Sequence, residues 1–319
     1  MADLILALDY GGTKLSAALA DLGRRQWLAL ERISSPPNKD ARYDQETILA
    51  LARRLLQNRT PAAVGVSFGG PVDAASGRVI LSHHVPGWQH MPLRDRLAQI
   101  FGVPVAVDND GNIAALGEFR YGAGQGCASL LYVTVSTGVG GGWVLDGQIY
   151  HGADSMAGEI GHTIVNPQGP PCICGRRGCV EAMASGPAIA RAARARLNAE
   201  PGAGAKLRAL VGNDLNALTA ERVAGAAAEG DLLAQRVMED AAHALGFGIG
   251  TAITLMNPER IVIGGGVSKS GERYWQELRQ AASTNTLPEM RSVERIVPAA
   301  LGDDAPLWGA VALAESLIK

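Results

Sequence analysis

The chain has few of the features that mark membrane, secreted or nucleic-acid-binding proteins. Its 319 residues include four cysteines, 5% aromatic residues and a formal net charge of −2, with no block of Lys or Arg. So few cysteines make no disulfide framework, and we expect a reducing cytoplasm. The missing basic block argues against nucleic acid and anionic membrane as partners. No run of about 18 apolar residues predicts a membrane span. The early Asp3 and Asp9 do not resemble a signal peptide.

Apolar residues and glycine are plentiful instead. The 47% of apolar residues supply a core for one large domain or two medium ones. Short apolar runs that end in glycine or polar turns predict buried strands. Residues 43–57 predict an amphipathic helix whose apolar face carries Ile48, Leu51, Leu55 and Leu56. The second half reads as mostly helical, interrupted by the strand-like run RIVIGGGVSKSG.

One pattern occurs twice. LILALDYGGTKLSAALADLG and SLLYVTVSTGVGGGWVLDGQI both read as strand, glycine turn and strand. Either they are copies within two related α/β lobes, or the similarity is what any two hairpins share; their spacing leaves both interpretations open. We expect an N-terminal lobe at residues 1–112, joined by a closing helix at about 304–319, and a C-terminal lobe at 113–303.

Three glycine-rich turns follow predicted strands, at Asp9–Lys14, Ser136–Gly142 and Gly264–Gly266. Glycine lets backbone N–H groups approach an anion closely. None of the turns matches a P-loop or a dinucleotide fingerprint. Each alone is consistent with a structural hairpin. Together they indicate a polyphosphate held between two lobes.

The segment VPVAVDNDGNIAALGEF places three polar residues where a buried strand meets a helix: Asp108, Asn109 and Asp110. One of them is needed to cap the helix. Function is the better account of the other two, because α/β proteins place ligand contacts at strand ends. A carboxylate there can accept a proton from a substrate hydroxyl.

Three cysteines and a histidine follow the spacing H-x9-C-x-C-x4-C: His162, Cys172, Cys174 and Cys179. A Cys3His set is typical of structural zinc, and the alternatives are a disulfide or plain buried thiols. Gly175 and Gly178 permit the tight turns that aim the sulfurs at one centre. If GEIGH is one helical turn, Glu159 and His162 share a face. Glu181 follows two residues after the last cysteine, so zinc would fix a wall of hydroxyl-binding groups.

These segments together resemble the ROK family, bacterial sugar kinases and related repressors with an actin-like (ribonuclease H-like), two-lobed α/β fold. The similar motifs run in order along nearly the whole chain: LDYGGTK, GGPVD, VPGWQHMPL, VDNDGNIAALGE, VSTGVGGG, GEIGH, CICGRRGCVE and IVIGGGVS. The resemblance implies ATP-dependent phosphorylation of a hexose hydroxyl, usually O6, in a cleft between the lobes.

By position, the resemblance makes Asp110 the catalytic base. It implies these sugar ligands: Gly70, Asn109, Asp110, Glu159, His162 and Glu181. It implies these contacts to ATP: Asp9, Gly11, Gly12, Thr13, Lys14, Thr137, Gly138, Gly265 and Gly266. We expect Mg²⁺ with the ATP, near Asp9, structural Zn²⁺ on the four Cys3His ligands, and a homodimer.

Three positions depart from the family pattern. Phe68-Gly69-Gly70 stands where Pro-Gly is common before PVD, His84 where asparagine is common, and Gly111 where alanine is usual. The first two border the expected sugar site, so they bear on the substrate more than on the reaction.

Glucose is the leading substrate, and kinases of N-acetylmannosamine, fructose, mannose or allose share most of these residues. A sugar-sensing repressor is a second hypothesis. Only eight residues precede Asp9, so we expect no helix-turn-helix ahead of it. A non-catalytic sugar-binding relic is a third hypothesis, which the retained Asp110 and phosphate turns oppose.

Overall fold

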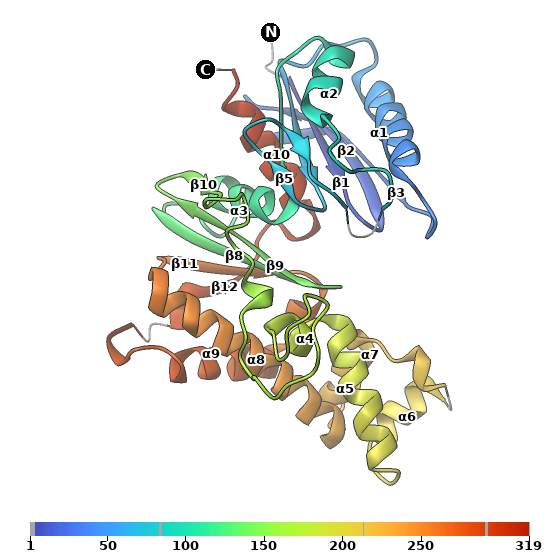
Figure 1. Cartoon of the computed structure of the whole chain (residues 1–319), viewed down its shortest axis with the longest axis vertical. Helices are drawn as coiled ribbons and strands as arrows, with labels where there is room; N and C mark the ends of the chain where they lie inside the picture. Colours follow the sequence, from blue (N-terminus) through green and yellow to red (C-terminus); the bar gives the residue numbers. More distant parts are fainter. Residues whose placement is uncertain (1–3, 83–84, 213, 291–292, 319) are drawn as a thin grey trace. The chain divides into compact units, whose positions relative to one another are not determined.

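The computed structural model describes residues 4–82, 85–212, 214–290 and 293–318 (Figure 1). The chain forms two compact units. The first comprises Met1–Leu130, Gly142–Gly158 and Ala300–Lys319, and the second comprises Leu131–Gly141 and Glu159–Ala299. The predicted lobe boundary at residue 112 stays a prediction.

The first unit is built on a five-stranded sheet with the order β3-β2-β1-β4-β7. Its strands are β1 Leu4–Tyr10, β2 Lys14–Asp21, β3 Gln26–Ser34, β4 Ala63–Phe68 and β7 Val105–Asn109. The first three form an antiparallel meander, and β4 and β7 add parallel to β1. Parallel β1, β4 and β7 therefore end at the same edge of the sheet. A separate ribbon pairs β5 Val72–Asp73 with β6 Arg78–Val79.

Helices cover both faces of this sheet. The helices are α1 Ala41–Leu56, α2 Leu93–Phe101, α3 Asp110–Tyr121 and α10 Ala305–Glu315. Alternate residues of β1 point to opposite faces. Leu6 and Leu8 join the core with α1 and α2, while Ile5 and Ala7 join the core with α3 and α10. The closing helix of the sequence thus packs within the first unit.

Helix α1 confirms the amphipathic helix predicted at residues 43–57. All four residues of its predicted apolar face are buried. The helix begins two residues earlier because Asp40 caps it, with Oδ1 accepting from the Tyr43 N–H at 2.8 Å.

The second sheet has the order β10-β9-β8-β11-β12. Its strands are β8 Ser129–Val135, β9 Val139–Leu145, β10 Gln148–Tyr150, β11 Arg260–Gly264 and β12 Ile296–Pro298. In both sheets the first hairpin sits in the middle, a third strand lies outside it, and two later strands follow on the other side. This shared order supports the internal repeat, because unrelated hairpins would not share the whole sheet.

The second unit is mostly helical, as the sequence predicts. Its helices are α4 Val180–Ala184, α5 Gly186–Ala199, α6 Ala205–Val211, α7 Ala220–Ala228, α8 Leu232–Met256 and α9 Glu272–Thr284. Short 3-10 turns occur in the chain at Ile160–His162, Leu215–Ala217, Gly266–Lys269, Pro288–Met290, Val293–Arg295 and Gly302–Asp304. Among the residues described above, no helix combines the length and apolar character that crossing a membrane requires.

Candidate active site

The first glycine turn joins β1 to β2 and follows a buried carboxylate. Asp9 is 6% exposed, and its Oδ1 accepts a hydrogen bond from the Ser67 hydroxyl at 2.9 Å. Burial raises the pKa of Asp9, although Ser67 and nearby cations oppose that shift. Gly12 is exposed, and an added Cβ there would meet no atom within 4 Å. Lys14 pairs with Asp303 at 3.6 Å. The turn therefore has open backbone beside a carboxylate that a cation would stabilise.

The polar strand end lies at the same sheet edge as this turn. Tyr10 is aligned with Phe68, and Phe68 with Asn109, across the three parallel strands. Asn109 supplies the helix cap, since its Oδ1 accepts from the Gly111 N–H at 2.9 Å. Its side-chain amide donates to the Gly70 carbonyl at 3.0 Å. The prediction that one of the three polar residues caps the helix is therefore confirmed, and the residue is Asn109. Asn109 also holds Gly70, one of the expected sugar ligands, through its side-chain amide.

Asp110 is the exposed member of the polar trio. Its Oδ1 accepts from the Gly111 N–H at 2.9 Å. Its Oδ2 is the oxygen that an added Cβ on Gly69 would approach to 3.7 Å. The carboxylate thus stands next to the Gly69–Gly70 turn, on the edge of the sheet that also carries Gly11 and Gly12. A hydroxyl bound at this edge could give its proton to Asp110.

Asp108 has a different role from the one the sequence favoured. It is 1% exposed, and its Oδ1 accepts from the Asn109 N–H and from the Asn112 amide. Its Oδ2 lies 2.6 Å from His151 Nε2. The Asp108 carboxylate raises the pKa of His151 above its ordinary value. Asp108 is therefore accounted for by structural contacts. His151 was missed because nothing in the sequence relates it to a residue 43 positions earlier.

The second glycine turn joins β8 to β9 and is held by an expected sugar ligand. Glu181, in α4, accepts from the Val139 N–H through Oε2 at 3.0 Å. An added Cβ on Gly138 would lie 2.7 Å from that same oxygen. Gly138 therefore leaves the space that Glu181 occupies. This contact was not predicted, because Glu181 and the turn lie far apart in the sequence.

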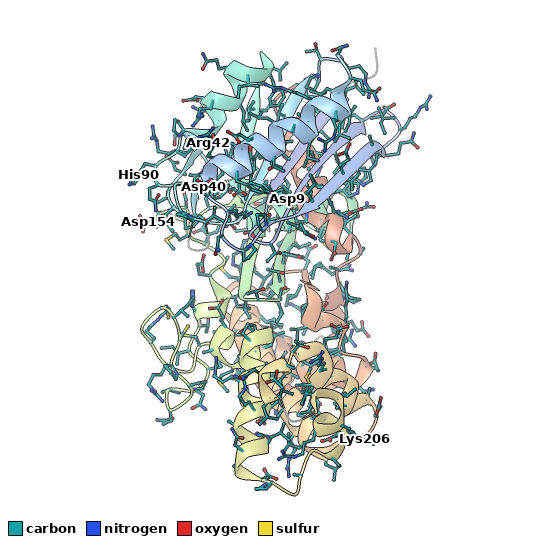
Figure 2. The ribbon with its side chains drawn as sticks, turned by 90° about the vertical axis from the view of Figure 1, so that its right-hand side faces the viewer. Asp9, Asp40, Arg42, His90, Asp154 and Lys206 are labelled. Carbon is teal, nitrogen blue, oxygen red and sulfur yellow. The ribbon has the colours of Figure 1, made fainter. Side chains whose placement is uncertain are left out.

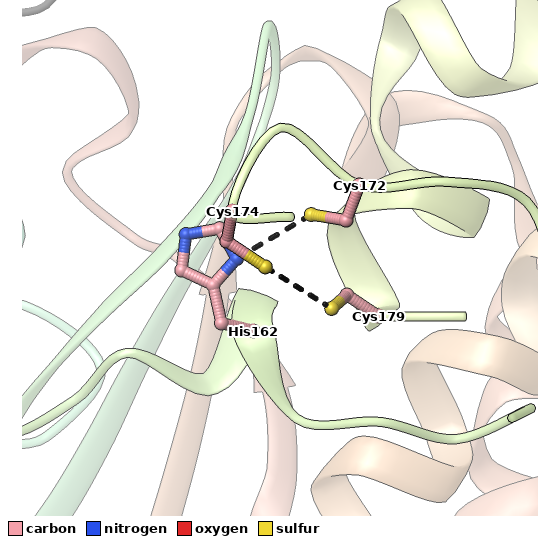
Figure 3. A group of neighbouring side chains, drawn as sticks. All are labelled: His162, Cys172, Cys174 and Cys179. Carbon is pink, nitrogen blue, oxygen red and sulfur yellow. Dashed lines mark hydrogen bonds between the residues drawn. The ribbon is translucent and has the colours of Figure 1, made fainter. Parts of the chain in front are cut away.

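The cysteine and histidine ligand atoms lie within 4.8 Å of one another (Figure 3). Cys174 Sγ is 3.7 Å from Cys179 Sγ, and Cys172 Sγ is 3.6 Å from His162 Nδ1. A tetrahedral ion with metal–sulfur bonds of about 2.3 Å and metal–nitrogen bonds of about 2.0 Å separates two sulfurs by about 3.8 Å and sulfur from nitrogen by about 3.5 Å. These two separations match a tetrahedral metal, and the four side chains together form a candidate metal site.

The surrounding loop explains how the ligands converge. Gly175 and Gly178 have φ of +84° and +68°, conformations that suit glycine. A Cβ on Gly178 would lie 1.5 Å from the Asn166 carbonyl oxygen. A hydrogen bond from Arg176 lowers the pKa of the Cys174 thiol to about 6. A thiolate is the form that binds metal.

His162 presents its two ring nitrogens to different partners. Nδ1 faces Cys172, while Nε2 lies 3.9 Å from Glu159 Oε2. The 3-10 turn Ile160–His162 brings Glu159 and His162 to one side, as the predicted helical turn required. The ring can therefore serve the metal site and a polar ligand at once.

A pocket of about 1030 Å³ lies within the second unit. Thr137 and Gly266, two predicted ATP contacts, line it. Arg191, Arg194 and Lys269 line it too and were not predicted. The signal for the arginines was their spacing of three on α5, which puts both on one helix face. Gly265 lies behind this wall, and a Cβ there would lie 2.3 Å from the Val135 carbonyl oxygen.

The structure brings the predicted residues together as two groups. The first unit holds the residues Asp9, Gly11, Gly12, Thr13, Lys14, Gly70, Asn109 and Asp110. The second unit holds Thr137, Gly138, Glu159, His162, Cys172, Cys174, Cys179, Glu181, Gly265 and Gly266. The roles implied for these residues stay predictions.

The departures from the family pattern have separate outcomes. Phe68 is 2% exposed, and the centroid of its ring lies 4.8 Å from that of Trp88. Phe68 therefore belongs to the core. Gly111 is buried, and its carbonyl oxygen would lie 2.6 Å from a Cβ on Gly142. His84 lies outside the described residues.

Comparisons with known proteins cover nearly the whole chain. The model of the ROK family matches residues 5–316. The glucokinase of Halalkalibacterium halodurans is 36% identical over 312 residues, which is 95% of this chain and 92% of the relative. The N-acetylmannosamine kinase of Citrobacter koseri is 34% identical over 310 residues, 97% of this chain and 98% of the relative.

Among solved structures, a ROK family glucokinase from Streptomyces griseus in complex with glucose and AMPPNP superposes with a TM-score of 0.83. It is 33% identical to this chain, and the match covers 98% of this chain and 99% of the other. This likeness confirms the expected mixed α/β, two-lobed actin-like fold. With a family model that spans residues 5–316 and relatives that match from end to end, the chain belongs to the ROK family.

Proposed function

We propose that this protein is an ATP-dependent hexose kinase that phosphorylates O6 of glucose. The observation that carries the proposal is the placement of Asp110, an exposed carboxylate at the strand-end edge that also carries Gly70 and the first glycine turn. Phosphoryl transfer depends on positioning and charge neutralisation more than on covalent help from the protein. A base beside an anion-binding turn is what that chemistry requires.

In this proposal Asp110 orients the sugar hydroxyl and accepts its proton as the bond to the γ-phosphorus forms. The bond from the γ-phosphorus to the bridging oxygen of ATP breaks, and ADP leaves. Asn109 stays in place through the helix cap and through its donation to the Gly70 carbonyl, so it can present polar atoms to the sugar.

The sugar contacts of the second unit are Glu159, His162 and Glu181. Their support is the short turn that places Glu159 beside His162 Nε2, and the position of Glu181 directly after the cysteine loop. The glucokinase relative and the glucose-bound S. griseus structure favour glucose.

The nucleotide would bind to the two glycine turns and the pocket of the second unit. Gly11, Gly12, Gly138 and Thr137 offer backbone or hydroxyl donors to phosphates. Gly266 lines the pocket that would take the adenosine, and Gly265 directly precedes it. Mg²⁺ would accompany the phosphates near Asp9, whose buried carboxylate a cation would stabilise.

Zinc is the metal that suits the Cys3His cluster. Thiolate and imidazole are its preferred ligands, and structural zinc sites use four protein ligands. With all four positions taken by protein, the ion would clamp the loop and leave the chemistry to Asp110. The cytoplasmic location and the homodimer rest on the sequence and the family resemblance.

A kinase of N-acetylmannosamine is the second candidate, favoured by the C. koseri relative. The deciding experiment measures ADP release with ATP and a panel of glucose, N-acetylmannosamine, fructose, mannose and allose. We expect the highest kcat/KM for glucose. A higher kcat/KM for N-acetylmannosamine would make the N-acetylmannosamine kinase the leading candidate. If none of the five sugars stimulates ADP release, the protein is not a kinase of these sugars.

A further inference from the structure

A buried ion pair lies beneath the first glycine turn. Lys39 Nζ is 2.8 Å from Asp44 Oδ1, and both side chains are only 3% exposed. Lys39 lies in the segment between β3 and α1, and Asp44 in the first turn of α1. Removing two charges from water is costly, so such a pair persists only when its geometry and its remaining hydrogen bonds are good.

The Lys39 ammonium reaches the turn itself. Nζ donates to the Gly11 carbonyl at 2.8 Å and to the Ser35 hydroxyl at 3.0 Å. The ammonium thus makes two hydrogen bonds, to Gly11 and Ser35, and an ion pair with Asp44 Oδ1. The Ser35 N–H also donates to the Thr13 carbonyl at 2.9 Å. The segment from Ser35 to Asp44 therefore holds the turn at two carbonyls.

Fixing the Gly11 carbonyl also fixes the N–H of the next residue. In a planar trans peptide, the carbonyl of one residue and the N–H of the next point in opposite directions. Because the Gly11 carbonyl points at Lys39, the Gly12 N–H points away from Lys39. Gly12 is exposed, and no atom lies within 4 Å of the position that a Cβ on it would take. The buried ammonium thus sets the direction of a donor on the face of the turn that is open to an anion.

Asp44 connects this pair to the aromatic core under the strand ends. Its Oδ2 accepts from Trp88 Nε1 at 3.2 Å. Trp88 is fully buried and packs edge-on against Tyr10 at 5.4 Å and Phe68 at 4.8 Å. Tyr10 directly precedes Gly11. One carboxylate therefore positions both the lysine that holds the turn and the ring that supports the strand before it.

Figure 2 shows Asp40, next to Lys39 in the chain, at the same end of the first unit as Asp9. Helix α1 starts there, so its first turn and the glycine turn are supported at one end of the sheet. This is the end that carries the predicted phosphate contacts.

We infer that Lys39 is a positioning residue for ATP. It acts through the Gly11 peptide, holding the Gly12 N–H toward the phosphates, while Asp44 holds the ammonium in place. The inference rests on the proposed function in one respect, because it takes the Gly11–Lys14 turn as a phosphate site. It adds a residue that touches neither substrate.

The test compares the double variant Lys39→Met with Asp44→Asn against two single variants. The double variant removes both charges and keeps the side-chain volumes similar. The new amide oxygen at position 44 can still accept from Trp88, but the Gly11 carbonyl loses its donor. In the single variant Asp44→Asn, Lys39 can still donate to the Gly11 carbonyl, but its buried ammonium has lost the carboxylate that paired with it. Ser35→Ala removes another acceptor of Lys39 and keeps the Gly11 contact. For each protein, ATP binding is measured by calorimetry, sugar KM by steady-state kinetics and Tm by melting.

The inference predicts that ATP affinity and stability separate. The double variant should bind ATP about tenfold more weakly, with glucose KM within twofold of wild type. Asp44→Asn should have the lower Tm of the two, because its ammonium is buried and unpaired, yet it should bind ATP more tightly than the double variant. Ser35→Ala should bind ATP like wild type.

Three results would overturn the inference. The first is that the double variant binds ATP as tightly as wild type does. The second is that ATP affinity decreases in step with Tm across all the variants, and the third is that wild type binds no ATP. If wild type binds ATP but phosphorylates no sugar, the proposed function fails while the calorimetry still decides the role of Lys39. If Asp44→Asn does not fold, the double variant and Ser35→Ala decide it.

Discussion

The two glycine turns have the same local pattern but are held in place by different kinds of residue. The first turn is held by Lys39, which has no predicted contact with a substrate. The second is held by Glu181, a predicted sugar ligand, through the Val139 N–H. Gly12 has open space where a Cβ would be, whereas Gly138 has Glu181 there.

This difference indicates what a change at each turn can affect. A substitution at the first turn should alter nucleotide binding alone. A substitution at the second turn should displace Glu181 and so alter nucleotide and sugar binding together.

The largest expected effect is a loss of kcat in Asp110→Asn, which tests the chemical step separately from binding at the two glycine turns. Asp110→Asn keeps the size of the side chain and an oxygen that can accept from the Gly111 N–H, but removes the basicity. General-base help contributes typically about 10²–10⁴-fold, so kcat should fall at least about a hundredfold, with a much smaller change in sugar KM. Steady-state kinetics with glucose and ATP measures both.

Asp108→Asn is the matched control for that variant. It lies two residues away and removes the buried charge that pairs with His151, so it should lower Tm while kcat stays much closer to wild type. A variant at Asp108 with no activity, beside an active Asp110→Asn, would assign the mechanism to the other carboxylate.

The second prediction tests the comparison of the turns directly. Gly138→Ala places a Cβ 2.7 Å from Glu181 Oε2, a distance that forces the carboxylate to move. We expect KM for glucose and KM for ATP each to rise about tenfold, a change of about 1.4 kcal/mol. Gly12→Ala, the control, meets no protein atom, so only KM for ATP should rise. Equal behaviour of the two variants would remove the distinction between the turns.

The third prediction concerns the zinc proposed for the Cys3His cluster, which directly precedes the helix that carries Glu181. Purified protein should contain one zinc per chain, measured by elemental analysis. Cys172→Ser should lose that zinc and raise glucose KM several-fold more than ATP KM, because Cys179 directly precedes the helix that carries Glu181. Cys127→Ser, outside the cluster, should change neither value. Absence of zinc from wild type would contradict the assignment.

The smallest expected effect is a pH dependence of stability at His151. Asp108 raises the pKa of His151 in the folded protein, so the folded state binds that proton more tightly. The stabilisation is full below the unfolded value of about 6.5 and is lost as pH rises through the folded value. The Tm difference between wild type and His151→Gln should therefore be larger at pH 6 than at pH 9.

His243→Gln is the control for this measurement. It removes a more exposed contact with Glu277, and solvent-exposed pairs contribute little to stability, so Tm should change little at either pH. A Tm difference for His151→Gln that grows with pH would contradict the account.

The sequence predicted the fold and most local features of the site for clear physical reasons. Strand runs, glycine turns and the apolar face of α1 are local patterns, and a local pattern determines local structure. The Cys3His spacing likewise predicts a cluster whose members lie within one loop. Asn109 was foreseeable as one of three possible caps, although the sequence left open which of the three it would be.

Contacts between distant segments were not predictable in this way. His151 finds Asp108 43 positions away, Glu181 reaches Val139 across 42, and Trp88 reaches Asp44 across 44. Lys39 has nothing in its own sequence to distinguish it from a solvated lysine. Only the packing of α1 against the sheet buries it and aims its ammonium at Gly11.

The measurement that tests the central claim most directly identifies the product that wild-type protein makes from ATP, Mg²⁺ and glucose by phosphorus NMR. The account predicts glucose 6-phosphate and ADP in equal amounts. The account would be contradicted if ATP remains intact. It would also be contradicted if ATP is consumed and inorganic phosphate accumulates in place of glucose 6-phosphate.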